Sequence, residues 1–192
     1  MQKREAHMNH IISIRDAALT YQARNGEVEA LGGVSFDVAE GEFVSIVGPS
    51  GCGKSTLLGV LAGLETLDGG TVALYGRPIA GASGQMGFMP QRDQLFEWRS
   101  IRDNVMLGLQ IRRDRDPAHH DHVETLLKRY DLSEFAAKRP DQLSGGMRQR
   151  CALIRTLATG PDILLLDEPF SALDYQTRLA VSGDIWRIIR SE

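Results

Sequence analysis

Runs of apolar residues predict short strands in the first third of the chain. One strand is predicted over residues 12–21. Residues 34–38 alternate between apolar and polar side chains in a half-buried pattern, and residues 43–47 form a more continuously apolar run. Gly26 and residues 40–42 supply the turns between them. We therefore expect the chain to begin as β-structure.

The pattern then changes to helical spacing. Leucines recur at helical intervals over residues 55–64, which predicts a helix there. Two shorter apolar runs follow and predict strands over residues 71–75 and 86–89. A strand, a glycine-rich loop and a helix are thus expected in succession between residues 43 and 64.

A polar and mostly helical stretch over residues 92–143 predicts an inserted helical lobe. Within it, Asp116 and Pro117 fit the cap and the first position of a helix. Ser144 fits the cap of the next helix, and residues 163–166 form an apolar strand. Strands that alternate with helices, some of them apolar throughout, predict an α/β fold with a mainly parallel sheet.

Composition agrees with a globular domain. Of 192 residues, 42% are hydrophobic and 24% are charged, which excludes a disordered or fibrous chain. The 22 basic and 25 acidic residues give a formal charge of −3, which argues against a basic nucleic-acid-binding surface. No run approaches the ~18 apolar residues of a membrane span, and the basic N-terminus lacks a signal-peptide core. We expect a cytoplasmic protein whose two cysteines stay thiols.

The segment from Gly48 to Ser55 fits G-x-x-x-x-G-K-[ST], the pattern of phosphate-binding loops. Its glycines let backbone N–H groups converge, and the following helix presents its positive end. Lys54 adds a charge for the β- and γ-phosphates, and Ser55 would place its hydroxyl on Mg²⁺. The alternative is a chance glycine turn, which the predicted strand before it and helix after it disfavour.

Two carboxylates, Asp167 and Glu168, directly follow the apolar strand 163–166. Such a strand places them at the carboxyl edge of the sheet, where ligands of open α/β sheets bind. Asp167 can meet Mg²⁺ directly or through water, and Glu168 is the candidate to orient or deprotonate an attacking water. The alternative is a solvated strand end, which the phosphate loop in the same chain disfavours.

A third motif, LSGGMRQR over residues 143–150, places two glycines at a predicted helix start, where unpaired N–H groups can bind an anion. With Gln91 at a strand end and SALD over residues 171–174, this ordered set resembles the ATP-binding subunit of ABC transporters over essentially the whole chain. The resemblance implies a P-loop NTPase core with a mainly parallel sheet and an N-terminal antiparallel β element. It also implies a core of residues 1–91 and 159–192 around a helical lobe of residues 92–158.

The resemblance assigns roles residue by residue. Catalysis falls to Lys54, Gln91 and Glu168, and Mg²⁺ to Ser55, Gln91 and Asp167. The ATP-binding set is Tyr21, Gly48, Pro49, Ser50, Gly51, Cys52, Gly53, Lys54, Ser55, Thr56, Gln91, Ser144, Gly145, Gly146 and Asp174. In this set Tyr21 matches the aromatic residue that stacks on adenine, with a plain strand-face tyrosine as the alternative.

The resemblance also implies partners. A second ATP-binding subunit would bind head to tail, so that its residues 144–146 close over the ATP in this chain's loop, with Asp174 communicating across the dimer. Membrane permease subunits would take up the motion on the cytoplasmic side of the cell membrane, with a solute-binding protein engaged indirectly and no nucleic acid. Leu95, Phe96 and Trp98 lie where the permease docks in the family; packing inside the helical lobe is the alternative.

The sequence departs from the family at two places. Met147 stands where the family most often has glutamine, and LSGGMRQR resembles the importer branch for nitrate, sulfonates and taurine. No histidine follows His122, whereas the family has a switch histidine beyond the acidic strand. The expectation is a chain truncated at its C-terminal end, which binds nucleotide and hydrolyses it poorly.

Weaker signals leave alternatives open. His119, His120 and His122 beside Asp121 could hold a metal, although a solvated helix start fits them better. An ABC-type ATPase of DNA repair or translation is the alternative function, and a phosphate-loop kinase or GTPase would leave LSGGMRQR unexplained. Inside the phosphate loop, a bulky adduct on Cys52 is expected to block ATP.

Overall fold

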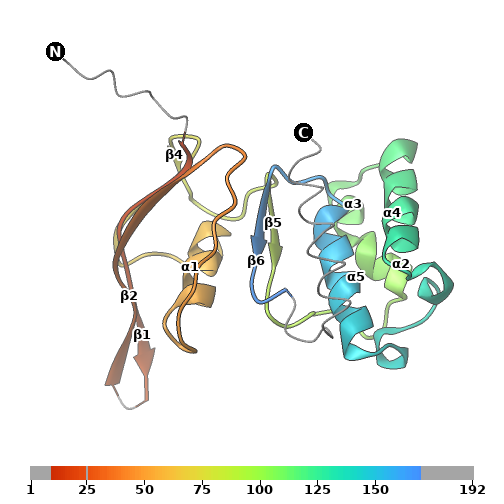
Figure 1. The fold of residues 1–192 in the computed structure, drawn as a ribbon, viewed down its shortest axis with the longest axis horizontal. Coiled ribbons are helices and arrows are strands. Elements are labelled where there is room, and N and C mark those ends of the chain that lie inside the picture. The colour runs from red at the N-terminus through yellow and green to blue at the C-terminus, as the bar shows by residue number, and fades with distance from the viewer. Residues whose placement is uncertain (1–9, 25, 170–192) are drawn as a thin grey trace. The chain divides into compact units, whose positions relative to one another are not determined.

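The computed structural model describes residues 10–24 and 26–169, which belong to two compact units, residues 1–83 and residues 84–192. The first unit is built on an antiparallel sheet, and long strands β1 and β2 form its twisted pair (Figure 1). The strand order is β2-β1-β3-β4, with bounds β1 His10–Ala23, β2 Gly26–Ala39, β3 Gly69–Leu74 and β4 Arg77–Pro78. The strands predicted over 12–21 and 71–75 are confirmed within a few residues, whereas the strand predicted over 34–38 is only the last part of β2, which begins eight residues earlier at Gly26.

A bulge in β1 explains why its buried positions do not alternate regularly. Ile12 and Ile14 are buried, but the next buried residues are Ala17 and Leu19. The register with β2 shifts between Ile14 and Ala17, where Asp16 has a φ of +47° and donates its N–H to Ser35 Oγ at 2.7 Å. One extra residue in the strand thus returns the apolar side chains to the core face.

Helix α1, Lys54–Leu61, packs beside β2 with Leu57, Val60 and Leu61 buried. The helix predicted over residues 55–64 is therefore confirmed except at its end. Gly63 adopts a φ of +71°, and a Cβ at that position would collide with the backbone of Gly81. A glycine in this conformation ends a helix, so Leu64 lies outside it and is 61% exposed.

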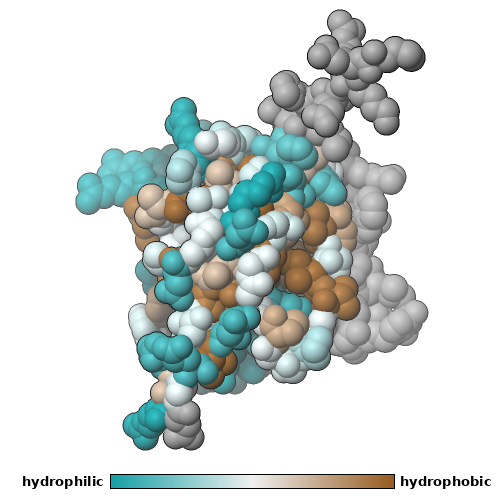
Figure 2. Space-filling view, turned by 90° about the vertical axis from the view of Figure 1, so that its left-hand side faces the viewer, coloured by the Kyte–Doolittle hydropathy of each residue, from teal (hydrophilic) through white to brown (hydrophobic). Residues whose placement is uncertain are grey.

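The strand predicted over residues 43–47 is not formed among the residues that the structure describes. Residues 43–49 pair with no strand there, and Phe43 and Val47 are 59% and 89% exposed. An apolar run indicates that a segment favours burial, but a strand also needs a neighbour to complete its hydrogen bonds, and the run itself does not specify one. Apolar side chains reach the molecular surface beside polar ones on the face in Figure 2.

The second unit contains a parallel strand pair and a helical core. β5, Met86–Met89, pairs with β6, Ile163–Leu166, from Met86 opposite Ile163 to Met89 opposite Leu166, and both match the predicted bounds. Helix α5 lies between this pair and α4 (Figure 1). The remaining elements are α2 Ile101–Val105, α3 Leu107–Arg112, α4 Pro117–Arg129, the 3₁₀ turns η1 Ser133–Phe135 and η2 Pro140–Gln142, and α5 Gly145–Leu157.

Capping residues fix where these helices start. Asp116 accepts the N–H of Ala118 at 2.9 Å, with Pro117 in the first turn of α4, and Ser144 accepts the N–H of Met147 at 3.3 Å at the start of α5. Both predicted caps are confirmed. Val123, Leu126 and Leu127 of α4 are buried. None of the helices described for residues 10–24 and 26–169 is long and apolar enough to span a bilayer.

A buried amide organises the segment before α2. Asn104, fully buried, accepts the N–H of Phe96 at 2.7 Å and donates to the carbonyl oxygens of Phe96 and Ser100 at 3.1 and 2.9 Å. A buried amide costs little when its hydrogen bonds are made, and here they tie residues 96–100 to the helix. The turn is therefore fixed by one side chain.

Candidate functional site

The phosphate loop requires glycine at two positions. Gly53, the residue before α1, has a φ of +92°, and a Cβ there would collide with the carbonyl oxygen of Ala30. Gly51 has a φ of +80° and opens onto free space. Glycine at 53 is therefore demanded by conformation and by crowding, whereas glycine at 51 is demanded by conformation alone.

Lys54 and the helix start give this loop its positive character. Lys54 Nζ donates to the carbonyl oxygens of Gly48 at 2.9 Å and Pro49 at 2.8 Å, and lies 3.8 Å from Cys52 Sγ. The helical ladder begins with the N–H of Leu57 on Gly53 O at 2.9 Å. The N–H groups of the first turn, which precede that bond, have no acceptor within the helix, and such groups at the positive end of a helix can bind an anion.

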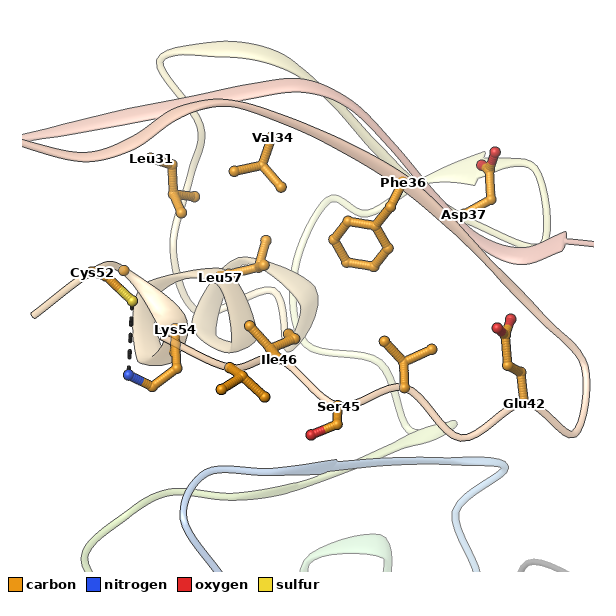
Figure 3. Close-up of a pocket in the computed structure, with 13 residues that line it drawn as sticks. Leu31, Val34, Phe36, Asp37, Glu42, Ser45, Ile46, Cys52, Lys54 and Leu57 are labelled. Carbon is orange, nitrogen blue, oxygen red and sulfur yellow. Dashed lines mark hydrogen bonds between the residues drawn. The ribbon is translucent and has the colours of Figure 1, made fainter. Parts of the chain in front are cut away.

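A pocket of about 460 Å³ adjoins the loop (Figure 3). Side chains of β2 such as Leu31 and Phe36 form one wall, and the extended residues 44–47 form another, while Cys52, Gly53 and Lys54 reach its edge. The pocket therefore combines an apolar lining with the cationic loop. Tyr21 is not among its lining residues; it lies on β1 opposite Val28 and is 40% exposed, so its place on adenine stays a prediction.

Asp167 and Glu168 lie at the carboxyl end of the parallel strand pair, as predicted. Asp167 is 6% exposed, and its N–H donates to Met89 O at 2.9 Å, one step beyond the last paired residue of β6. Its carboxylate is thus held at the edge of the sheet where ligands of such folds bind.

Gln91 and Glu168 are brought into direct contact although 77 residues separate them. Gln91 Nε2 donates to Glu168 Oε2 at 2.9 Å. Glu168 has a φ of +48°, a conformation that costs a non-glycine residue about 1–3 kcal/mol. Its carbonyl oxygen accepts a hydrogen bond from Gln149 Nε2 of α5 at 3.2 Å. Two of the residues predicted to be catalytic therefore form one hydrogen-bonded pair.

The start of α5 presents the predicted anion-binding turn. Ser144 and Gly145 are exposed, and the Ser144 hydroxyl caps the helix. Met147, at the departure from the family pattern, packs its side chain partly buried against the hydrophobic core of the lobe. A thioether in this position cannot provide the hydrogen bonds of a glutamine side chain.

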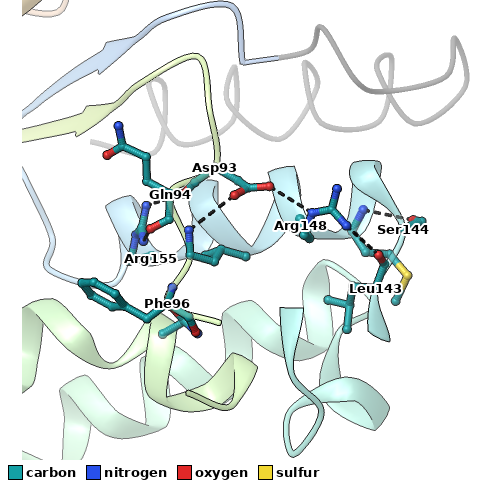
Figure 4. A network of polar contacts seen from close by, with 10 residues as sticks. Asp93, Gln94, Phe96, Leu143, Ser144, Arg148 and Arg155 are labelled. Carbon is teal, nitrogen blue, oxygen red and sulfur yellow. Dashed lines mark hydrogen bonds and ion pairs between the residues drawn. The ribbon is translucent and has the colours of Figure 1, made fainter. Parts of the chain in front are cut away.

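Two arginines of α5 hold the segment that follows Gln91 (Figure 4). Arg148 pairs through Nε with Asp93 Oδ2 at 3.1 Å and donates to Leu143 O at 2.9 Å. Arg155, two helical turns later, donates to the carbonyl oxygens of Asp93 at 2.7 Å and Gln94 at 2.8 Å. Burial lowers the pKa of Arg155 and raises that of the neighbouring Cys151 to about 12. Sequence reasoning missed the contacts of Arg148 and Arg155. Their seven-residue spacing predicts that both lie on one face of the helix, but it does not identify their acceptors.

The aromatic segment after Gln91 is divided between core and surface. Leu95 is 7% exposed and belongs to the core of the lobe, which is the packing alternative and not the predicted permease contact. Trp98 is 71% exposed, and its ring centroid lies 4.9 Å from that of Phe96. Among the described residues Trp98 is therefore exposed, and Phe96 is half-buried beside it.

The histidine cluster fits the solvated helix start better than a metal site. His119 Nδ1 lies 2.7 Å from Asp114 Oδ2, and both are on the surface. The pKa of Asp114 is lowered, first by the N–H of Asp116 and then by His119. Within residues 10–24 and 26–169, no three side chains of the metal-binding types gather at one point. Asp174 lies outside the described residues, so its predicted role stays a prediction.

The chain is similar to known ABC transporter ATP-binding proteins. The family described as ABC transporter matches residues 31–171. The chain is 42% identical over 184 residues to the uncharacterized ABC transporter ATP-binding protein YtlC of Bacillus subtilis, covering 96% of this chain and 68% of that one. It is 45% identical over 169 residues to the taurine import ATP-binding protein TauB of Rhizobium johnstonii, covering 88% and 64%. The chain thus spans about two thirds of the length of these relatives.

A solved structure shows the same fold. The ATP-binding cassette MJ0796, in a dimeric post-hydrolysis state bound to ADP and Pi, superposes with a TM-score of 0.85 and 31% sequence identity. The match covers 94% of this chain and 83% of that one. With a family match over most of its length and relatives above 40% identity, the chain belongs to the ABC transporter family, as an ATP-binding protein with the P-loop NTPase fold and the ATPase domain of that family.

Proposed function

We propose that this chain binds MgATP and hydrolyses it as the energy-coupling subunit of an ABC importer for a small solute of the nitrate, sulfonate or taurine kind. The observation that carries this proposal is the direct hydrogen bond between Gln91 and Glu168, because it joins two of the three predicted catalytic residues at the carboxyl ends of β5 and β6. The taurine import proteins among the relatives support the solute class. No reported relative favours a role in DNA repair or translation.

The phosphate loop binds the nucleotide in this proposal. The first-turn N–H groups of α1 and the Lys54 ammonium face the β- and γ-phosphates, with Thr56 beside them. Tyr21 stacks on the adenine. The donors proposed for Mg²⁺ are the Ser55 hydroxyl, the Gln91 amide oxygen and the buried Asp167 carboxylate, and hard oxygen donors of this kind suit that ion. When bound, Mg²⁺ neutralises charge on the phosphates.

Glu168 orients the attacking water and accepts its proton. Phosphoryl transfer depends mainly on positioning and charge stabilisation, so a carboxylate held by Gln91 suits this role. The turn of Ser144, Gly145 and Gly146, whose first two residues are exposed, closes over the ATP of a second subunit, and Asp174 signals between the two. The dimeric state of MJ0796 supports this arrangement.

The remaining partners are membrane proteins. The exposed Trp98 and the adjoining Phe96 ring offer a permease an apolar contact close to the segment that follows Gln91. Loss of the γ-phosphate contacts would separate the two ATP-binding subunits and pass that motion to the permease. The subunit therefore works at the cytoplasmic face of the cell membrane, with a solute-binding protein engaged through the permease.

Two substitutions test binding and hydrolysis separately. Lys54→Ala is expected to weaken MgATP binding at least about 30-fold, which is about 2 kcal/mol for a lost charged contact. Glu168→Gln is expected to keep MgATP affinity within about twofold and to lower kcat at least about 100-fold, the range of a lost general base. Calorimetry and phosphate release measure the two effects.

Lys128→Ala serves as the matched control, because Lys128 is an exposed helix lysine of α4, outside the loop. It should leave both quantities at the wild-type level. Wild-type protein that gives no heat with MgATP, or Glu168→Gln protein that turns over at the wild-type rate, contradicts the proposed function.

A further inference from the structure

Gln149 links α5 to the candidate catalytic glutamate. It is 5% exposed, and its side-chain amide donates from Nε2 to the carbonyl oxygen of Glu168 at 3.2 Å. A buried amide directed at one specific backbone atom is a stronger constraint than an apolar side chain, because the hydrogen bond fixes orientation as well as distance. The family resemblance assigns no role to Gln149.

Glu168 is a residue whose conformation needs such support. Its φ of +48° is disfavoured for a side chain with a Cβ, so neighbouring contacts must hold it. Two amides do so from different directions, since Gln91 binds the carboxylate and Gln149 binds the backbone carbonyl. The direction in which the carboxylate points therefore depends on both.

The helix that carries Gln149 is itself fixed to the segment after Gln91. Arg155 binds the carbonyl oxygens of Asp93 and Gln94, and Arg148 binds the Asp93 carboxylate. Because α5 contacts both Glu168 and this segment, it sets the geometry of the Gln91–Glu168 pair from both sides. The same helix begins at the exposed Ser144 turn.

We propose that Gln149 is a positioning residue for ATP hydrolysis, which holds the left-handed backbone of Glu168 so that its carboxylate meets the attacking water. The inference rests on the proposed function, because it gives Gln149 a part in the same hydrolytic step. In this role Gln149 acts through Glu168.

The first test separates turnover from binding. Gln149→Leu removes the donor and keeps a side chain of similar size, so kcat is expected to fall about 10- to 100-fold, the cost of a small misplacement of a catalytic group. The dissociation constant for MgATP should stay within about twofold. Gln110→Leu is the matched control, because Gln110 is an exposed helix glutamine whose side chain bonds only to Arg99 among the contacts described, and the kcat of this variant should not change.

The second test uses pH. In the Gln149→Glu variant, a protonated carboxyl can donate to the Glu168 carbonyl, whereas a carboxylate cannot. The ratio of its kcat to that of the wild type should therefore rise as pH falls, and the ratio for Gln149→Leu should stay flat. A residue that only fills space would give flat ratios for both variants, and that result overturns the proposal.

The third test needs no turnover. Amide hydrogen exchange in Gln149→Leu should become faster for residues 167–168 and stay unchanged for α5. Faster exchange throughout α5, or unchanged exchange at 167–168, overturns the proposal. If the proposed function is wrong, the wild-type protein will neither bind nor hydrolyse MgATP. The exchange measurement tests the Gln149–Glu168 contact in either case, so the two failures can be told apart.

Discussion

The phosphate loop and the Gln91–Glu168 pair hold their shapes in different ways. The loop is a local structure, in which Lys54 binds carbonyl oxygens five and six residues away and Gly53 supplies the required backbone angle. The pair joins residues 77 positions apart, and the supporting ion pair of Arg148 and Asp93 spans 55. A local motif therefore encodes its own geometry, whereas the pair depends on how the second unit folds.

The two cysteines give the largest expected difference between these regions. Cys52 is exposed in the loop, whereas Cys151 of α5 is buried with its pKa raised from 9.0 to about 12. At pH 8 this leaves Cys151 with about a thousandfold less thiolate than an unperturbed thiol, and the thiolate is the reactive form. Iodoacetamide should thus label Cys52 in the native protein and Cys151 only after unfolding, as peptide mass spectrometry can show.

The raised pKa of Cys151 also makes the stability of the folded protein depend on pH. The folded state favours the protonated Cys151 thiol, so this contribution to stability is complete below the unfolded pKa of 9.0 and is lost as pH rises towards about 12.

If MgATP binds the loop, it should also protect Cys52 from labelling. Equal labelling of the two cysteines in the native protein would remove the contrast between the regions.

Glycine substitutions in the loop give the next largest effect. Gly53→Ala meets both a left-handed φ and a collision with Ala30, so it should destabilise the protein by about 3 kcal/mol, as strained backbone positions do. Gly51→Ala meets only the backbone penalty, about 1 kcal/mol. Urea unfolding measures both, and similar losses for the two variants would show that crowding at Ala30 has no effect.

Arginine substitutions in α5 give the smallest effect. Arg155→Met leaves two carbonyl oxygens without their donor and should cost about 2 kcal/mol. Arg148→Met breaks a half-exposed ion pair and should cost under about 1 kcal/mol. The order is measured by urea unfolding. A larger loss for Arg148→Met would mean that its ion pair with Asp93, and not the carbonyl contacts, holds the segment after Gln91.

Sequence predicted the elements whose signals are local. The apolar runs located β5 and β6, and the caps Asp116 and Ser144 located two helices, because each depends on residues close to one another in the chain. The prediction of a strand over residues 43–47 was wrong, because strand pairing depends on a neighbouring strand that an apolar run does not identify. The predicted end of α1 was wrong, because Gly63, with its positive φ, ends the helix before Leu64.

The candidate site was predictable to a similar degree. Its motifs lead to Lys54, Gln91, Asp167 and Glu168, but not to the residues that hold them. Arg155 and Gln149 bind backbone carbonyl oxygens, and every residue has a carbonyl group, so no pattern of side chains marks the acceptor. Such contacts become visible only when the fold brings a helix face against a loop.

The buried Asn104 has a consequence for how a partner would dock. Its hydrogen bonds to Phe96 and Ser100 keep the turn that displays Trp98 in one arrangement. Surfaces that are already rigid lose little conformational freedom on association, so more of the contact energy appears as affinity. A permease that docks here, as proposed, would meet an aromatic surface that is already formed, and complex formation at this point would resemble the docking of two rigid bodies more than coupled folding.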